Sequence, residues 1–157
     1  MSRDTLERFY GAFAARDAEQ MSSCYAPTAR FTDPVFRLDG EDIGDMWRML
    51  IERGPDLGVD HDVLDPTHAR WTARYRFKGR PVVNAVRSSF RFDNRGMIVE
   101  QVDEFDFPRW AGQALGWKGR LFGRTAFLRH AVQRSAEAGL RRWQERRAAG
   151  GPARPNL

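Results

Sequence analysis

The sequence is short of cysteine, lysine and long apolar runs, and these shortages narrow the class of protein. Its one cysteine, Cys24, excludes a disulfide within the chain. No segment approaches the roughly 18 consecutive apolar residues that a membrane-spanning helix needs. The first residues also lack the basic and then apolar layout of a secretory signal. We therefore expect a globular protein of the cytoplasm.

Sequence motifs for cofactor binding are absent as well. There is no glycine-rich phosphate loop, no Ser-His-Asp order and no cluster of cysteine and histidine. His61 and His68 lack a matching pair of carboxylates, and we interpret both as surface residues rather than metal ligands. We therefore expect neither a metal nor an organic cofactor.

The positive charge of the chain is concentrated in its last third. The 157 residues carry 26 basic and 21 acidic side chains, a net charge of +5, with an isoelectric point near 10.1. Residues 108–157 contain ten arginines and one lysine against two glutamates. We expect no nucleic-acid binding there, because the cations show no interleaved stacking surface and no known binding module.

The first half of the chain has the spacing of helices. Apolar residues at i, i+3, i+4 and i+7 predict an amphipathic helix over residues 4–16, and residues 17–25 suit a short second helix that ends at Ala26-Pro27. Residues 30–36 follow as a short extended piece. The helical spacing then returns from Ile43 to Leu50, and Arg53-Gly54-Pro55 closes this third helix.

After residue 55 the period changes to two, which indicates strands. Apolar and polar residues alternate strictly over residues 69–78, and strands are also predicted over residues 82–92 and 97–107, with a weaker one over 59–64. The segments 79–80 and 93–96 turn the chain between them. Helices followed by a curved antiparallel sheet predict an α+β single domain.

One acid stands out in the last of these strands. Asp103 shares a strand face with Met97, Val99, Phe105 and other largely apolar residues, while the neighbouring acids point to the opposite face. A lone carboxylate among apolar side chains is costly unless it is partnered, protonated or used in chemistry. Asp103 is therefore the strongest candidate for a functional residue.

The two turns also predict a register. Pairing Phe77 with Val82 and Phe92 with Met97 places polar groups of three strands on one inner face. The predicted cross-strand rows are Tyr75–Asn84–Phe105, Ala73–Val86–Asp103 and Trp71–Ser88–Gln101. Two interpretations stay open: the polar groups satisfy one another in an ordinary core, or they line a small-molecule pocket, which four polar groups in one patch favour.

The order of these segments resembles the nuclear transport factor 2-like superfamily over residues 4–110, in its branch of SnoaL-like polyketide cyclases and ketosteroid isomerases. The segments that carry the resemblance are residues 9–17, 31–35, 40–47, 89–92 and 102–106. The resemblance implies a cone-shaped fold with N-terminal helices packed on a curved antiparallel sheet, here with an added C-terminal helix. It also implies a homodimer formed through the sheet and a small hydrophobic ligand.

The resemblance also assigns roles to two carboxylates. Asp33, in its Asp-Pro-Val setting, matches the general base of ketosteroid isomerase, but the positions of that enzyme's oxyanion donors fall on Phe9 and Ser88. Asp103 matches the acid/base aspartate of the cyclases and one aspartate of limonene epoxide hydrolase. Epoxide hydrolysis is disfavoured, because residues 69–72 offer no second carboxylate.

We therefore expect a small-molecule-binding domain that is either a cofactor-independent isomerase or cyclase, or a non-catalytic ligand-binding or dimerisation module. In the catalytic case Asp103 carries the proton and Asp33 lies near the mouth of the pocket, although Asp33 is equally suited to be a turn residue. The expected ligand-binding residues are Tyr10, Trp47, Trp71, Tyr75, Asn84, Ser88, Gln101 and Phe105.

The chain continues beyond the usual end of this fold. We divide it into a domain over residues 1–110, a helical extension over 111–147 that packs on the same domain, and a disordered tail over 148–157. The extension is expected to hold a short helix at 110–116, a glycine-broken loop at 116–123 and a basic amphipathic helix from Thr125 to Arg147. Packing of this helix on protein is expected in preference to association with a membrane surface, because Ser135 and Gly139 interrupt its apolar face.

Overall fold

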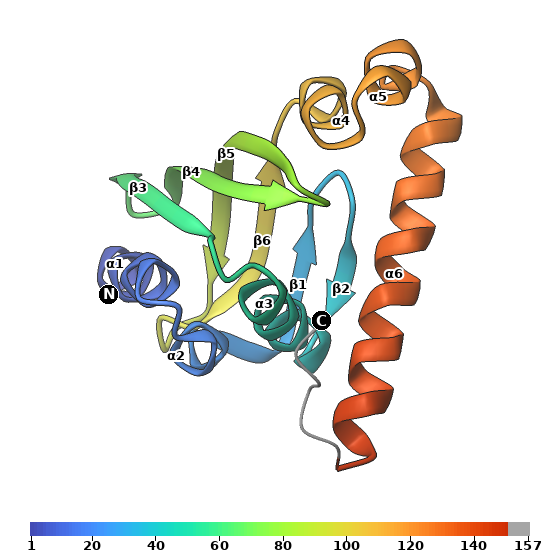
Figure 1. Cartoon of the computed structure of the whole chain (residues 1–157). Helices are drawn as coiled ribbons and strands as arrows, with labels where there is room; N and C mark the ends of the chain where they lie inside the picture. Colours follow the sequence, from blue (N-terminus) through green and yellow to red (C-terminus); the bar gives the residue numbers. More distant parts are fainter. Residues whose placement is uncertain (151–157) are drawn as a thin grey trace.

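A computed structural model describes residues 1–150 of the chain (Figure 1). Two helices begin the chain, and a third lies between the second and the third strand. A curved and open six-stranded sheet forms the centre, and three further helices follow the sheet. This is the α+β architecture that the sequence predicts. Within the described part of the chain, no helix is both long enough and apolar enough to cross a membrane.

The first three helices lie close to their predicted positions. They are α1 (Ser2–Ala14), α2 (Ala18–Ser23) and α3 (Glu41–Arg53). Asp17 caps α2, because its carboxylate accepts a hydrogen bond from the backbone N–H of Gln20 at 3.0 Å. The buried faces of α1 and α3 pack against one face of the sheet and, with it, form the larger of two hydrophobic clusters.

The sheet has the strand order β2-β1-β6-β5-β4-β3. Its strands are β1 (Tyr25–Thr32), β2 (Arg37–Asp39), β3 (Gly58–Asp65), β4 (His68–Phe77), β5 (Arg80–Phe92) and β6 (Ile98–Glu104). Neighbouring strands are antiparallel except for β1 and β6, which run parallel because the chain leaves β1 and returns beside it only after β2–β5.

The start of β1 corrects one prediction. Tyr25 begins a strand rather than ending the second helix, and the extended segment reaches Thr32 rather than Phe36. Pro27 predicts the end of a helix, but a proline is also tolerated where one side of a strand has no partner. That is the case here, because β2 pairs only with Arg30–Thr32 and leaves the preceding part of β1 free on that side.

The register of the sheet differs from the predicted one by two residues at the first hairpin and, beyond a bulge, by two residues at the second. Phe77 pairs with Arg80, because Lys78 and Gly79 both adopt positive φ angles, 49° and 80°, and form a two-residue turn. At the second hairpin the register shifts between Arg91 and Phe92, and Phe92 pairs with Ile98. A shift of two keeps Ser88, Gln101 and Asp103 on their predicted face, whereas the bulge places Ile98 in the core instead of on the outer face. The rows change, however, and Asp103 pairs with Ser88.

The last part of the chain forms three helices over one end and one side of the sheet (Figure 1). They are α4 (Phe107–Leu115), α5 (Trp117–Phe122) and α6 (Ala126–Ala148). α5 replaces the predicted loop at 116–123, because its glycines allow a helical turn to contact the backbone of α4 closely. Most of the predicted disordered tail, residues 151–157, lies outside the described residues.

Helix α6 packs along the domain by both apolar and polar contacts. Leu140 and Trp143 are buried, and the indole N–H of Trp143 donates to Glu52 on α3 at 2.8 Å. Gln133 donates to the carbonyl oxygen of Pro34 at 3.0 Å, between β1 and β2. These contacts fix the helix against α3 and against the β1–β2 turn.

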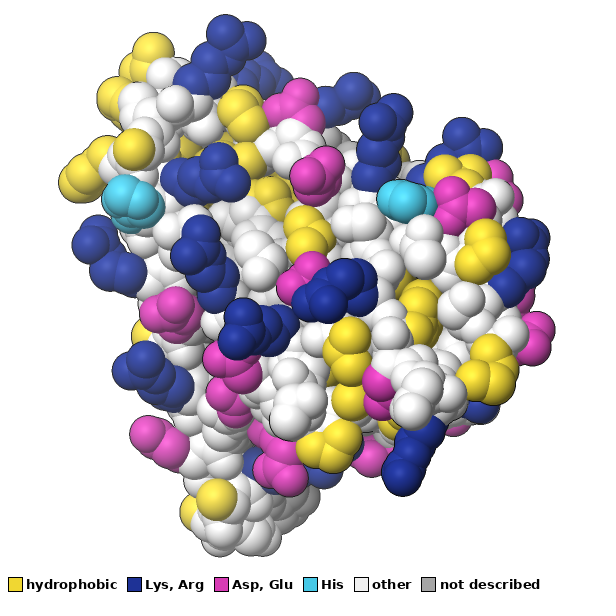
Figure 2. Space-filling view, turned by 180° about the vertical axis from the view of Figure 1, so that it is seen from behind, with side chains coloured by type: hydrophobic (Ala, Val, Ile, Leu, Met, Phe, Trp, Pro, Cys, Tyr) yellow, Lys and Arg dark blue, Asp and Glu magenta, His cyan; other side chains and the backbone are white. Residues whose placement is uncertain are grey.

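The surface combines dispersed charges with exposed apolar side chains, several of which lie at one corner of the molecule. Figure 2 shows basic and acidic side chains interspersed over the side seen from behind, and apolar side chains gathered at the corner formed by α5 and the start of α6. On β3 and β4 the charges pair across strands, since Arg70 and Arg74 bind Asp62 and Asp60 at 2.9 and 3.3 Å.

Candidate functional site

Asp103 lies in the interior of the domain, on the face of the sheet that α1 and α3 cover. Only 3% of the residue is exposed, and Ser88, its cross-strand partner, is 2% exposed. The hydroxyl of Ser88 donates to Asp103 Oδ1 at 2.5 Å and in turn accepts the indole N–H of Trp71 at 2.9 Å. One branch of donors therefore runs from β4 through β5 to the carboxyl group.

A second branch reaches the same oxygen from the opposite side. The amide nitrogen of Gln101 donates to Asp103 Oδ1 at 2.9 Å. The amide oxygen of Gln101 accepts the hydroxyl of Tyr25, which accepts the indole N–H of Trp47 at 3.0 Å. We call the whole chain from Trp47 to Trp71 through Asp103 the inner-face network; Tyr25, Gln101 and Ser88 are its other members.

The second carboxyl oxygen of Asp103 behaves differently. Oδ2 makes no hydrogen bond with the described residues, and it is not among their fully buried unpaired side-chain atoms. Burial raises the pKa of Asp103 from 3.8 to about 7. Hydrogen bonds from Ser88 and Gln101 oppose this rise, and the negative charge of Asp33 adds to it. The carboxyl group is thus able to gain or lose a proton near neutral pH.

Tyr10 on α1 supplies a free donor beside the network. Its hydroxyl is the one fully buried side-chain oxygen or nitrogen within residues 1–150 that has no hydrogen-bond partner. Burial, together with the nearby charge of Asp103, raises the pKa of Tyr10 well above its usual range, against an opposing effect of the neighbouring Ser88 hydroxyl, so the phenol keeps its proton. A buried unpaired donor costs free energy and is rare in folded proteins. A ligand oxygen in this position would satisfy it.

Asp33 lies in the turn between β1 and β2 and has a structural role there. Its Oδ1 accepts the backbone N–H groups of Val35 and Phe36, both at 2.6 Å. Burial raises its pKa from 3.8 to about 6, while the two backbone hydrogen bonds and the positive charge of Arg129 work in the opposite direction. Asp33 is thus a turn aspartate whose second oxygen makes no hydrogen bond within residues 1–150.

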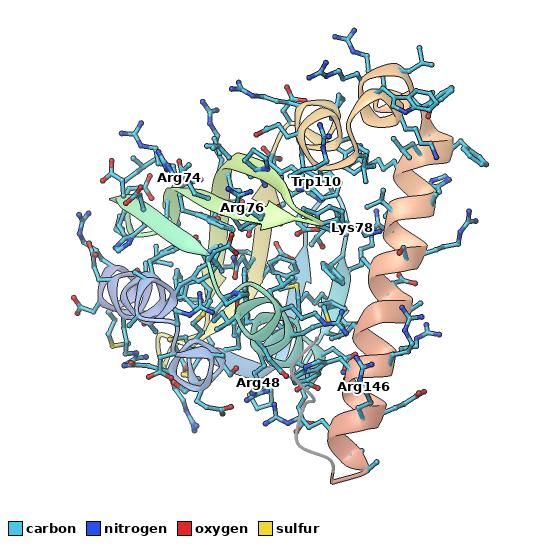
Figure 3. The ribbon with its side chains drawn as sticks, viewed as in Figure 1. Arg48, Arg74, Arg76, Lys78, Trp110 and Arg146 are labelled. Atoms are coloured by element: carbon cyan, nitrogen blue, oxygen red, sulfur yellow. The ribbon has the colours of Figure 1, made fainter. Side chains whose placement is uncertain are left out.

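A second cluster lies near Asp33, at the α4 end of the sheet. The charge of Asp33 contributes to a raised pKa of Tyr75 on β4, which results mainly from burial. The hydroxyl of Tyr75 accepts the indole N–H of Trp110 at 2.7 Å. Figure 3 shows Trp110 on α4, beside the end of the sheet where Lys78 marks the β4–β5 turn. Phe105 also belongs to this cluster.

The structure thus divides the predicted site residues into two groups. Five of them join in the inner-face network, and Tyr10 lies beside it, whereas Tyr75 and Phe105 belong to the second cluster. Asn84 is half-buried on the same sheet face, opposite Ala73, and its side chain makes no hydrogen bond within residues 1–150. The five that join are Trp47, Trp71, Ser88, Gln101 and Asp103.

The sequence pattern does not predict two members of these groups. It places Tyr25 in a helix, although Tyr25, Ala29 and Phe31 are buried residues of one strand that a bulge interrupts. It indicates Trp110 only as part of a short helix. Its signal was Asp106, which caps α4 by accepting the N–H of Arg109 at 3.1 Å and so directs that helix across the end of the sheet.

An inner-face pocket remains a prediction. A hollow of about 580 Å³ lies at the β1–β2 edge, and another of about 460 Å³ lies between the start of β5 and α4–α5, but neither Asp103 nor Asp33 lines them. Within residues 1–150, no group of three or more histidine, cysteine, aspartate or glutamate side chains is placed to hold a metal ion.

Comparison with solved structures defines the class of protein to which this fold belongs. An NTF2-like protein of unknown function from Burkholderia pseudomallei is 20% identical, with a TM-score of 0.59 over 72% of this chain and 96% of its own. A candidate polyketide cyclase from Silicibacter sp. is 16% identical, with a TM-score of 0.57 over 71% and 93%. AclR, a candidate hydroxylase from Streptomyces galilaeus, is 14% identical, with a TM-score of 0.57 over 76% and 96%. The fold is NTF2-like.

The family follows from the sequence itself. The model of the SnoaL-like domain matches residues 6–101, and the chain therefore belongs to the SnoaL-like family. The comparison with curated proteins found no match. The matched segment holds every member of the inner-face network except Asp103, which follows its last residue by two positions.

Proposed function

We propose that this SnoaL-like domain binds a hydrophobic, carbonyl-bearing small molecule and moves a proton on it without a cofactor. The observation that carries the proposal is the state of Asp103. One oxygen is held by two donors, the other is free, and the pKa is about 7. A general acid or base works best when its pKa lies near the working pH. The SnoaL-like family and the candidate cyclase among the similar folds support a role of this kind.

In the proposed reaction, Oδ2 of ionised Asp103 takes a proton from the carbon next to the substrate carbonyl. The C–H bond breaks, its electron pair forms a C=C bond to the carbonyl carbon, and the π pair of the carbonyl group moves onto oxygen, which gives an enolate. The unpaired hydroxyl of Tyr10 donates a hydrogen bond to that oxygen. Ser88 is not free to do so, because its hydroxyl already donates to Asp103. Asp103 then returns the proton to another atom of the substrate, which completes an isomerisation or follows ring closure.

The remaining inner-face residues suit the approach of such a ligand. Along the sheet from Asp103 towards α4, Trp71, Asn84 and Tyr75 are half-buried and face the same side. They offer two aromatic surfaces and one amide, which is the usual composition of a small-molecule site. Asp33 lies near Tyr75 and would face the entrance. The substrate is therefore expected to be largely apolar, with few polar groups.

The proposal is tested with 2-tetralone, a small apolar ketone, as the probe. Exchange of its α-protons in D₂O is followed by proton NMR with the full chain and with Asp103→Asn. The substitution is expected to lower the protein-catalysed rate by at least about a hundredfold. Asp39→Asn, which removes an exposed carboxylate on β2, is the matched control and is expected to leave the rate unchanged. Equal rates for the wild type and Asp103→Asn would reject Asp103 as the proton carrier.

Ligand binding without catalysis is the second candidate. The observation that favours it is the aromatic packing at the two ends of the inner-face network, where Phe13 contacts the rings of Trp47 and Trp71 at centroid distances of 5.0 and 5.2 Å. In that case 2-tetralone would perturb the NMR signals of inner-face residues, and its exchange rate would equal that of buffer alone.

A further inference from the structure

The corner formed by α5 and the first turn of α6 exposes large apolar side chains. Trp117 is 67% exposed, Leu121 66%, Phe122 44% and Phe127 78%. We call this set, together with the cations between its members, the α5 corner. Figure 2 shows it as the apolar concentration at one extremity of the molecule. Exposed apolar residues scattered singly are ordinary, but a contiguous group with basic neighbours marks an interaction surface.

The packing of α5 explains why these side chains point outwards. Gly119 and Gly123 form the inward side of this segment. A Cβ atom added at Gly119 would lie 1.8 Å from the carbonyl oxygen of Ala111, and one added at Gly123 would lie 3.2 Å from Pro108 Cα. The contact between α5 and α4 is therefore made by backbone. Because glycines occupy the inward positions, the large apolar residues between them have no place in the core.

The start of α6 contributes Phe127 in the same way. The hydroxyl of Thr125 accepts the backbone N–H of Leu128 at 3.2 Å and fixes the first turn of the helix. In that orientation Leu128 packs against the cluster of Phe107 and Trp110, whereas Phe127 points to solvent.

The charge around the α5 corner has one sign. Lys118, Arg120 and Arg124 are exposed between its apolar residues. Residues 108–136 contain no aspartate or glutamate at all, although the chain as a whole is 30% charged. The sequence pattern alone predicts no stacking surface interleaved with the cations of this segment. The helical turn of α5 creates one, because it brings Trp117 and Leu121, four positions apart, onto one side.

We propose that the α5 corner binds the surface of membranes that contain anionic lipids. Its tryptophan, leucine and phenylalanine side chains enter the headgroup region, and its three cations contact lipid phosphates and carboxylates. A second copy of the chain is a poorer occupant, because a two-fold contact would place these cations against one another. The apolar face of α6 is not involved, since Leu140 and Trp143 are already buried against the domain.

The test is flotation of the full chain with phosphatidylcholine vesicles, with and without phosphatidylserine. We expect binding only to the vesicles that contain phosphatidylserine, and we expect added salt to weaken it. The combined substitutions Lys118→Gln, Arg120→Gln and Arg124→Gln are expected to lower the affinity about a hundredfold, since each cation contributes about a fivefold factor. The matched control neutralises Arg141, Arg142 and Arg146, which are exposed on the later part of α6. Figure 3 shows Arg146 there, far from α5.

A second variant separates the apolar contribution from the charge. Trp117→Ser, Leu121→Ser and Phe127→Ser together are expected to lower vesicle affinity at least about tenfold without changing the melting temperature, because all three side chains are largely exposed. Leu64→Ser with Val83→Ser, at exposed positions elsewhere, is the matched control. The proposal fails if the chain does not bind anionic vesicles, or if corner and control variants bind equally. It also fails if the corner variants abolish self-association or oligonucleotide binding while vesicle binding persists.

Discussion

The pKa of Asp103 makes the stability of the domain depend on pH in a definite direction. Because the pKa is higher in the folded chain, about 7, than its ordinary value of 3.8, the fold favours the protonated carboxyl group. The contribution of Asp103 to stability is complete below pH ~4 and declines as the pH rises. Above pH ~7 the group is ionised in both states, and the decline ends.

The size of the effect follows from the same two values. Each tenfold change in an equilibrium constant corresponds to about 1.4 kcal/mol, so a pKa of about 7 in place of 3.8 corresponds to about 4 kcal/mol. Asp103→Asn keeps an oxygen that accepts from Ser88 and Gln101 but has no charge. The difference in unfolding free energy between this variant and the wild type is therefore expected to change by about 4 kcal/mol between acidic and mildly alkaline pH, in favour of the variant.

Urea denaturation at a series of pH values between about 4 and 8.5 measures this difference. The raised pKa of Asp33 affects wild type and variant alike and largely cancels in the comparison, apart from its charge interaction with Asp103. Asp39→Asn is again the control, and its difference from the wild type should change little over the range. If the difference for Asp103→Asn is also constant, the carboxyl group ionises near its ordinary pKa, and our account of its burial is wrong.

Two further predictions concern the supports of the site and of the extension. Tyr25→Phe removes the hydroxyl between Trp47 and Gln101, leaves two buried polar groups unpaired, and should lower the unfolding free energy in urea by about 2 kcal/mol. Gly119→Ala places a methyl group against backbone atoms, and it should accelerate hydrogen exchange in α5 while the sheet stays protected. Gly58→Ala is the control, because a Cβ atom there meets nothing within 4 Å, and it should not accelerate exchange in α5.

The sequence predicts which side chains share a face of the sheet, but it does not predict which residues pair across neighbouring strands. The alternation along β4, β5 and β6 placed Ser88, Gln101 and Asp103 on one side, and a register error of two residues leaves that side unchanged. The rows depend on the turn at Lys78–Gly79 and on a bulge, and both involve backbone angles that the apolar pattern does not reveal.

The extension was harder to predict for a related reason. The sequence from Trp117 to Gly123 contains two glycines, and glycine usually indicates a loop. Here the glycines allow two helices to touch through their backbones, so the contact leaves no hydrophobic pattern in the sequence. The helix after it was predicted well, because its Thr125 cap and its length are local features.

The direction of the hydrogen bonds in the inner-face network has a consequence for residues distant from its centre. From Trp47 and from Trp71 alike, each donor points towards Asp103 Oδ1, so the dipoles of both branches are aligned on one oxygen. The acidity of this carboxyl group is therefore set partly by two indole rings that never touch it. Evolution or design can tune the proton affinity of Asp103 from either end of the network without altering the carboxyl group or its immediate partners.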